Sequence, residues 1–308
     1  MSAPLGQVQK PTETATEMES EVATARRSRL PNWFAILWAN RKSRLGLVLL
    51  AVFVLVAVFA PLIAPHDPKS TGFEQSLPPS ADHLMGTTAS GQDIWSQLVH
   101  GARTSLIVGV VAGLLVTLIA LLVGLVAGYM QGWVDEVLSF LINLALVVPV
   151  LPLMITLAAY SPVRGLGLII LVISITGWAW GARVKRAQIL TLRARDYITA
   201  ARFAGESTIR IVFAEIMPNM MSLVVAGFLG AAGGAIGAEA GLEFLGLGDP
   251  TTISWGTMLY WANNNGAMLT GQWLWLGAPG LAIALLLTSL TLINFGVDAL
   301  SNPHLRER

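Results

Sequence analysis

Charged residues are scarce in this chain. Of its 308 residues only 12% are Asp, Glu, Lys or Arg, while 54% are hydrophobic. Ordinary globular domains carry about 25% charged residues. So few charges cannot cover a surface that faces water. The composition therefore excludes an ordinary soluble protein and predicts an integral membrane protein.

Cysteine is absent, which excludes disulfides and thiolate-bound metals. The phosphate-binding pattern Gly-x-x-x-x-Gly-Lys-Ser/Thr and the zinc pattern His-Glu-x-x-His are absent too. All four histidines fall outside the apolar runs. We therefore expect no enzyme activity, no catalytic residue, no metal site and no bound cofactor in this chain. Any ATP hydrolysis must come from a partner.

Long apolar runs are abundant. A helix of about 20 residues spans a bilayer, and by this length rule the runs predict an all-α membrane fold with about six transmembrane helices. The predicted spans are 45–64, 104–130, 137–160, 165–182, 222–238 and 277–297.

The basic residues give the orientation, because cytoplasmic loops are enriched in Lys and Arg. With the N-terminus inside, only Lys69, Arg103 and Arg164 of the nineteen basic residues lie outside. This bias predicts that the N- and C-termini are both cytosolic, in a multi-pass protein of the cytoplasmic membrane. The main loop inside the transmembrane block, residues 183–219, then faces the cytosol.

The spans and loops divide the chain into five parts. They are a cytosolic tail (1–44, disordered and then basic and amphipathic), a first transmembrane helix (45–64), an external loop (65–103), a transmembrane core (104–300) and a cytosolic tail (301–308). The core contains the cytosolic loop 183–219 and an external loop at 246–276.

The polar stretch from Asp196 to Asn219 predicts two short helices that are separated at Gly205. The first, Tyr197–Ala204, is rich in alanine. The second, Ser207–Met217, begins with a hydroxyl residue near its N-cap and carries several isoleucines. The sequence Pro218-Asn219 predicts a break before the next span. Such a loop is suited to docking against another protein.

This stretch resembles the EAA loop of permease subunits in ABC importers of the oligopeptide, dipeptide and nickel class. The matching residues are Ala200, Ala201, Gly205, Pro218 and Asn219, whereas Thr199 and Glu215 depart from the pattern. Two further segments, 84–106 and 237–259, resemble the same family, in its second permease subunit (the DppC/OppC subfamily).

The resemblance implies a type I ABC importer permease in a bacterial or archaeal inner membrane. It implies four kinds of partner: a homologous second permease subunit, two ATPase subunits that hold ATP and Mg²⁺, an extracytoplasmic substrate-binding protein and membrane lipid. No nucleic acid is implied. The coupling residues expected to dock on the ATPase are Ala200, Ala201, Arg202, Gly205, Ile209 and Pro218.

Two acidic residues lie at the far end of the fifth span. Glu239 and Glu243 are spaced four apart and share one helix face. One expectation is that, near the outer boundary, they line a gate or contact the binding protein. The alternative is that they form a structural pair at the interface. Pro149 and Pro152 should kink the third span, either beside the pathway or for packing alone.

Glycines recur four residues apart in the fifth span, as Gly230/Gly234, Gly233/Gly237 and Gly237/Gly241. Small residues at this spacing let membrane helices approach closely. These glycines predict either packing within the subunit or a seam against a second permease subunit.

Peptides are the expected cargo, with oligosaccharides or nickel as alternatives on the same architecture. A single-chain secondary transporter is the alternative from another class. It would need ionisable or unwound sites in the middle of the membrane, and the sequence offers few. A membrane-integral enzyme is disfavoured, since no nucleophile and base or metal set is present.

Overall fold

The computed structural model describes residues 32–301, with side chains for 36–298. Predictions for 1–31 and 302–308 lie outside the described residues. Within the described range the regular structure is helical, apart from one isolated bridge between Thr87 and Asp93. The helices are α2 (Asn32–Ala39), α3 (Arg41–Val58), α4 (Ala60–Ile63), α5 (Ile94–Met130), α6 (Trp133–Val147), α7 (Val150–Ala159), α8 (Leu166–Thr176), α9 (Ala179–Arg193), α10 (Asp196–Phe203), α11 (Thr208–Arg210), the π-helical η1 (Ile211–Ile216), α12 (Met217–Phe244), α13 (Trp255–Asn264) and α14 (Trp273–Ser301).

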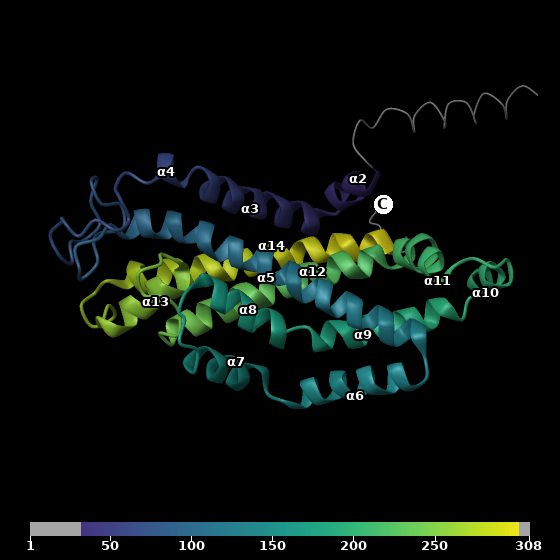
Figure 1. Cartoon of the computed structure of the whole chain (residues 1–308). Helices are drawn as coiled ribbons and strands as arrows, with labels where there is room; N and C mark the ends of the chain where they lie inside the picture. The colour runs from purple at the N-terminus through teal and green to yellow at the C-terminus, as the bar shows by residue number, and fades with distance from the viewer. Residues whose placement is uncertain (1–31, 302–308) are drawn as a thin grey trace, which may run out of the picture.

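The long helices form one elongated bundle (Figure 1). Three helical stretches are long and apolar enough to cross a bilayer, namely Ile94–Met130, Thr208–Phe244 and Trp273–Asp298. Two bent pairs, α6 with α7 and α8 with α9, would add two crossings if each pair is one span. The described residues thus contain three to five candidate spans, and the number six stays a prediction.

Helix α3 occupies most of the predicted first span, 45–64. Its 18 residues begin with Arg41, Lys42 and Arg44, so its apolar part is short. It lies along α14 (Figure 1). A Cβ atom built on Gly46 would lie 2.6 Å from the carbonyl oxygen of Ser289, so the two backbones are in close contact.

Helix α5 is the centre of the bundle and packs along both α9 and α12. A Cβ built on Gly113 would lie 2.7 Å from Cα of Ala232 in α12, and one on Gly128 would lie 2.9 Å from Cβ of Ile189 in α9. Glycine is required at both contacts because any side chain would separate the helices.

The second helix begins earlier than its apolar run. We expected it to start at Thr104, but α5 starts at Ile94. The Asp93 side chain accepts a 2.8 Å hydrogen bond from the backbone N–H of Ser96 and caps the helix. The polar loop therefore ends at residue 93 rather than 103.

The predicted kink in the third span is confirmed. Helices α6 and α7 meet at an angle of 84° across Val148 and Pro149. Pro149 is the N-cap of α7. Pro152 falls in the first turn, where a missing N–H leaves no hydrogen bond unmade.

The fourth span is bent as well, which the sequence analysis did not predict. Helices α8 and α9 meet at 41° around Gly177. Helix α9 continues to Arg193, well beyond the predicted end at Ala182, because Ile189 and Leu192 are buried against α5 and the segments that follow. The predicted loop 183–219 is thus helical over its first eleven residues.

The break predicted at Pro218 is wrong. The helical path is continuous from Thr208 to Phe244, and the wide π-helical turn η1 leads directly into α12. The N–H of Met217 bonds to the carbonyl of Val212, five residues back. This wider turn admits a proline in the first turn of α12 without ending the helix.

The two ends of the bundle differ. The loop 64–93 and helix α13 lie at one end, whereas α10 and α11 project from the other, toward which the C-terminal end of α14 also points (Figure 1).

Candidate functional site

The helical elbow, residues 196–216, has the two-helix form that the sequence predicts. Helix α10 ends at Phe203, and Gly205 follows its C-cap with a φ of +79°, which favours glycine. The N–H of Gly205 bonds to the carbonyl of Arg202 at 3.0 Å, and that of Glu206 bonds to the carbonyl of Ala201 at 3.1 Å. This pair of bonds is a Schellman stop. The Ser207 side chain caps the next helix.

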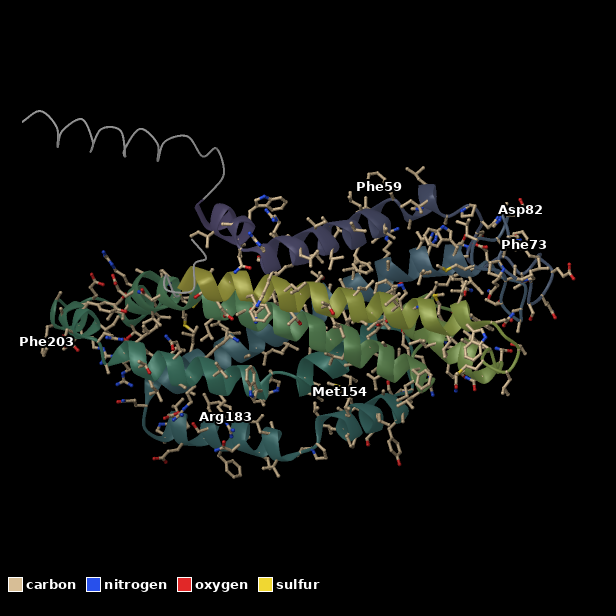
Figure 2. All side chains as sticks on the ribbon, turned by 180° about the vertical axis from the view of Figure 1, so that it is seen from behind. Phe59, Phe73, Asp82, Met154, Arg183 and Phe203 are labelled. Atoms are coloured by element: carbon tan, nitrogen blue, oxygen red, sulfur yellow. The ribbon has the colours of Figure 1, made fainter. Side chains whose placement is uncertain are left out.

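Large apolar side chains on the elbow are exposed. Phe203 is 88% exposed, Ile209 71% and Phe213 65%. Figure 2 shows Phe203 at the extreme end of the molecule. Exposed apolar side chains of this size favour a contact with another molecule or with lipid. The sequence analysis singled out Ile209 but missed Phe203 and Phe213.

The structure brings the predicted coupling residues to the elbow and its junction with α12. Exposed members of the set are Ala200, Arg202, Gly205, Ile209 and Pro218, and Ala201 is half-buried. The Arg202 guanidinium lies over the ring of Tyr129, 5.4 Å from its centre. The set is therefore accessible, as a docking contact requires, and its role stays a prediction.

The buried side of the elbow fixes it to the bundle. Ile198, Ile211 and Ile216 are almost fully buried in one cluster with residues of α5, α9 and α12. At the end of α9, Arg193 donates a 3.0 Å hydrogen bond to the carbonyl of Tyr129 in α5. The elbow is therefore packed against the long helices rather than forming a loose loop.

A cavity of about 900 Å³ lies among α5, α6, α7, α8, α9 and α12, and Asn294 of α14 also lines it. Most of its lining is apolar, and one wall is formed by Gly227, Gly230, Gly234 and Gly237 of α12. Pro149, at the bend of the third span, lines it, and Pro152 does not. The bend therefore shapes one wall of the cavity.

Glu239 and Glu243 do not line this cavity. They are 0% and 2% exposed, although their position at the end of the span predicted an interfacial pair. Ser105 of α5 donates to Glu239 at 3.2 Å, and Ser254, the N-cap of α13, donates to Glu243. The pair fastens α13 to α12 and α5. The pair is thus buried within the chain rather than interfacial, and its role at a gate or a binding-protein contact stays a prediction.

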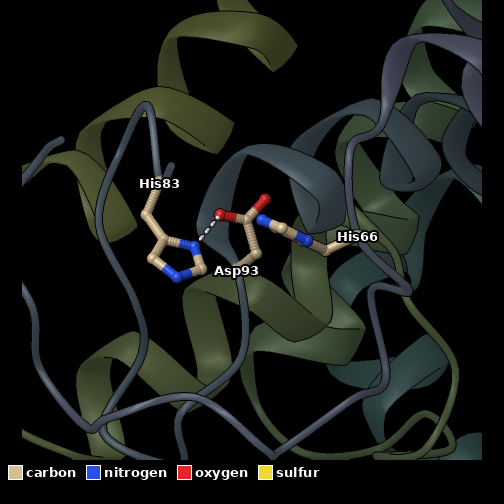
Figure 3. Close-up of side chains that lie close together, drawn as sticks. All are labelled: His66, His83 and Asp93. Atoms are coloured by element: carbon tan, nitrogen blue, oxygen red, sulfur yellow. Dashed lines mark hydrogen bonds and ion pairs between the residues drawn. The ribbon is translucent and has the colours of Figure 1, made fainter. Parts of the chain in front are cut away.

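Two histidines and an aspartate meet at the start of α5 (Figure 3). The ligand atoms of His66, His83 and Asp93 lie within 4.8 Å of one another, a juxtaposition that the sequence analysis missed. His83 Nδ1 donates to Asp93 Oδ1 at 2.9 Å, and Asp93 Oδ2 accepts from Ser96. Because both carboxylate oxygens are already hydrogen-bonded within the chain, the cluster anchors the polar loop.

Two family models match the chain. Residues 120–307 match the binding-protein-dependent transport system inner membrane component, and residues 33–79 match the N-terminal transmembrane domain of oligopeptide transport permease C. Together they cover most of the described bundle.

Curated relatives match over similar lengths. The chain is 35% identical over 271 residues to a dipeptide transport system permease protein, DppC, of Bacillus subtilis, covering 87% of this chain and 83% of that protein. It is 34% identical over 281 residues to a di/tripeptide permease protein of Pseudomonas aeruginosa, covering 87% and 90%. An oligopeptide permease protein, OppC, of Bacillus subtilis is 33% identical over 222 residues, covering 71% and 72%.

A solved structure shares the fold. A structure described as an inward-facing conformation of the MetNI methionine ABC transporter matches with a TM-score of 0.56 at 18% identity. The match covers 68% of this chain and 97% of that one. The predicted type I permease fold is thereby supported.

Proposed function

The chain belongs to the family of binding-protein-dependent transport system inner membrane components, and on that premise we propose that it forms half of a pathway that imports peptides. Membership makes it a membrane permease subunit of an ABC importer without catalysis of its own. Peptides are favoured over oligosaccharides or nickel because the relatives named above are dipeptide, di/tripeptide and oligopeptide permeases.

The proposed assembly contains a homologous second permease subunit, two ATPase subunits and an extracytoplasmic substrate-binding protein. ATP and Mg²⁺ belong to the ATPases, since this sequence lacks the phosphate-binding pattern. The cavity and the open glycine wall of α12 support a second permease: a Cβ on Gly230, Gly234 or Gly237 would meet nothing within 4 Å.

The observation that carries the proposal is the elbow, with its exposed apolar face and its buried anchor. Its apolar residues, led by Phe203 and Ile209, fit a groove on an ATPase. Basic residues such as Arg193, Arg195 and Arg202 gather around it, which supports a cytosolic position.

In this proposal ATP binding brings the two ATPases together, and each elbow follows its ATPase. Because the elbow is packed into one cluster with α5, α9 and α12, the long helices move with it as a rigid body. The pathway between the two permeases then opens to one side of the membrane at a time.

Gly205→Pro tests this coupling. Proline fixes φ near −65°, so it cannot adopt the φ of +79° at this position. The resulting strain of roughly 1–3 kcal/mol or local unfolding should displace the docking face. We expect ATP-driven peptide uptake by the reconstituted complex to fall at least tenfold, roughly, while the chain still reaches the membrane.

Gly271→Pro is the matched control. Gly271 has a φ of +78° and the same open surroundings, but it precedes α14 rather than lying on the elbow. Normal uptake in Gly205→Pro, or an equal loss in Gly271→Pro, would contradict the docking role. Uptake by the purified chain without ATPases would favour a secondary transporter.

A further inference from the structure

One lysine of the bundle is buried, and the described residues place no partner at its ammonium group. Lys185 of α9 is 3% exposed. Its neighbour Arg186 forms a two-point ion pair with Asp135 at 2.6 and 2.7 Å. No acidic group or hydrogen-bond acceptor within residues 36–298 pairs with the Lys185 ammonium.

Three glycines make room for this side chain. A Cβ on Gly124 of α5 would lie 2.9 Å from the Lys185 Cβ, so the stem leaves α9 at a tight contact. A Cβ on Gly181 would lie 3.5 Å from Nζ, and one on Gly227 of α12 would lie 3.1 Å from it. The ammonium thus reaches from α9 to the glycine wall of α12.

Lys185 lines the cavity together with polar side chains that include Thr117 and Asn294. The amide N–H of Asn294 can donate to an anion, although its Oδ1, which is unpaired within residues 36–298, cannot. Thr117 of α5 lines it too, is 5% exposed, and its Oγ1 has no hydrogen-bond partner among the described residues. The first turn of α9, including Ala179 and Gly181, lines the same cavity. The start of a helix has free N–H groups and a partial positive charge.

No Asp or Glu is among the residues that line the cavity. A buried ammonium without a counter-charge is costly. A carboxylate that enters the cavity would supply the counter-charge that the lining lacks. A volume of about 900 Å³ accommodates a short peptide.

We propose that Lys185, with Thr117, binds a carboxylate in this cavity, and that this carboxylate is the C-terminus of a peptide on its way through the importer. The proposal rests on the proposed function. It assigns a role in the pathway to a residue that sequence reasoning had placed in a cytosolic loop.

The test compares trialanine with trialanine amide, which lacks the C-terminal carboxylate. Uptake of each is measured in proteoliposomes that contain the complete importer with its binding protein, for the wild type and for Lys185→Met. The wild type and Lys185→Met use the same binding protein. Its own preference for trialanine or trialanine amide therefore affects both acid-to-amide uptake ratios equally and does not alter their comparison. Since hydrogen bonds to charged groups change binding by about tenfold or more, we expect Lys185→Met to lower the acid-to-amide ratio by about that factor.

Two controls accompany the test. Lys185→Arg keeps the charge and should keep most of the ratio. Lys69→Met removes an exposed lysine of the polar loop and should leave the ratio unchanged. The thermal unfolding temperature of Lys185→Met should not fall, because no partner loses a bond.

The outcomes separate the two proposals. A wild-type complex that takes up trialanine, with an unchanged ratio in Lys185→Met, would overturn the carboxylate site and leave the peptide importer intact. Loss of the second permease subunit from Lys185→Met complexes would assign the carboxylate to that subunit and overturn the substrate role. A wild-type complex that imports neither peptide would refute the proposed function itself.

Discussion

Glycines recur four residues apart on two helices, as Gly109/Gly113 and Gly124/Gly128 on α5 and as Gly230/Gly234 on α12, but the surroundings of the two faces differ. On α5 a Cβ at Gly113 or Gly128 would lie within 3 Å of a neighbouring helix. On α12 a Cβ at Gly230 or Gly234 would meet nothing within 4 Å. The first face is filled by helices of the same chain, and the second lines the cavity.

The comparison shows what a small-residue pattern indicates. Such spacing predicts that helices approach closely, but it does not say whether the partner helix belongs to the same chain. The α5 face is already occupied, so its glycines serve the fold. The α12 face is open and lines the cavity, which leaves room for the proposed second permease subunit to approach α12 and close the cavity.

The largest effect is expected on the occupied face. In Gly113→Val the new side chain would collide with the backbone of Ala232, and overpacking of this kind costs about 1–3 kcal/mol or more. We expect a lower yield of folded protein and a clearly reduced unfolding temperature in detergent. Gly230→Val, on the open face, is the control. An equal loss of stability in that variant would show that the two glycine faces do not differ in packing.

A smaller effect on the fold and a specific effect on assembly are expected for Gly234→Leu. The chain itself should change in stability by only about 0.5 kcal/mol, as for an exposed position. Recovery of the second permease subunit in a pull-down should fall about tenfold. This factor corresponds to a loss of roughly 1.4 kcal/mol in the free energy of binding between the two subunits. Full recovery would show that this face does not form the seam.

Whether Gly234 lies close to the second permease subunit can be tested separately. Because the chain has no cysteine, Gly234→Cys introduces a single thiol. We expect a thiol- and amine-reactive bifunctional reagent to link it to the second permease subunit in the assembled complex, and the absence of this product would count against the seam.

The smallest effect is expected at Gly233, which lies on the same helix but faces α14. A Cβ there would make an ordinary contact, 3.5 Å from Leu287 Cδ2. Replacement of glycine by alanine inside a helix stabilises it by up to about 1 kcal/mol. Gly233→Ala should therefore raise the unfolding temperature slightly, and a decrease would mean that the contact with α14 is tighter than the structure shows.

Some features of the elbow could be predicted from the sequence, and others could not. The break at Gly205 and the cap at Ser207 were predictable, because both depend on local backbone chemistry. The exposed face was predictable only in part. Ile209 and Ile211 are equally apolar and two residues apart, yet one is 71% exposed and the other 1%, and only the direction in which η1 packs distinguishes them.

The acidic pair and the cavity lysine show the same limit. Glu239 and Glu243 are polar residues near the end of a span, and their position alone favours an interfacial role. The fold instead places Ser105 and Ser254 against them. Lys185 follows the predicted end of the fourth span, and only the continuation of α9 against α5 buries it.

The sequence by itself determined that this protein is helical, lies in a membrane and belongs to the importer permeases, because composition, run length and local motifs act over short stretches of chain. The tertiary structure alone decided which glycine face is occupied, which apolar residues of the elbow are exposed and which charge lines the cavity. These properties depend on contacts between residues far apart in the chain, as between Gly113 and Ala232, and no local pattern specifies them.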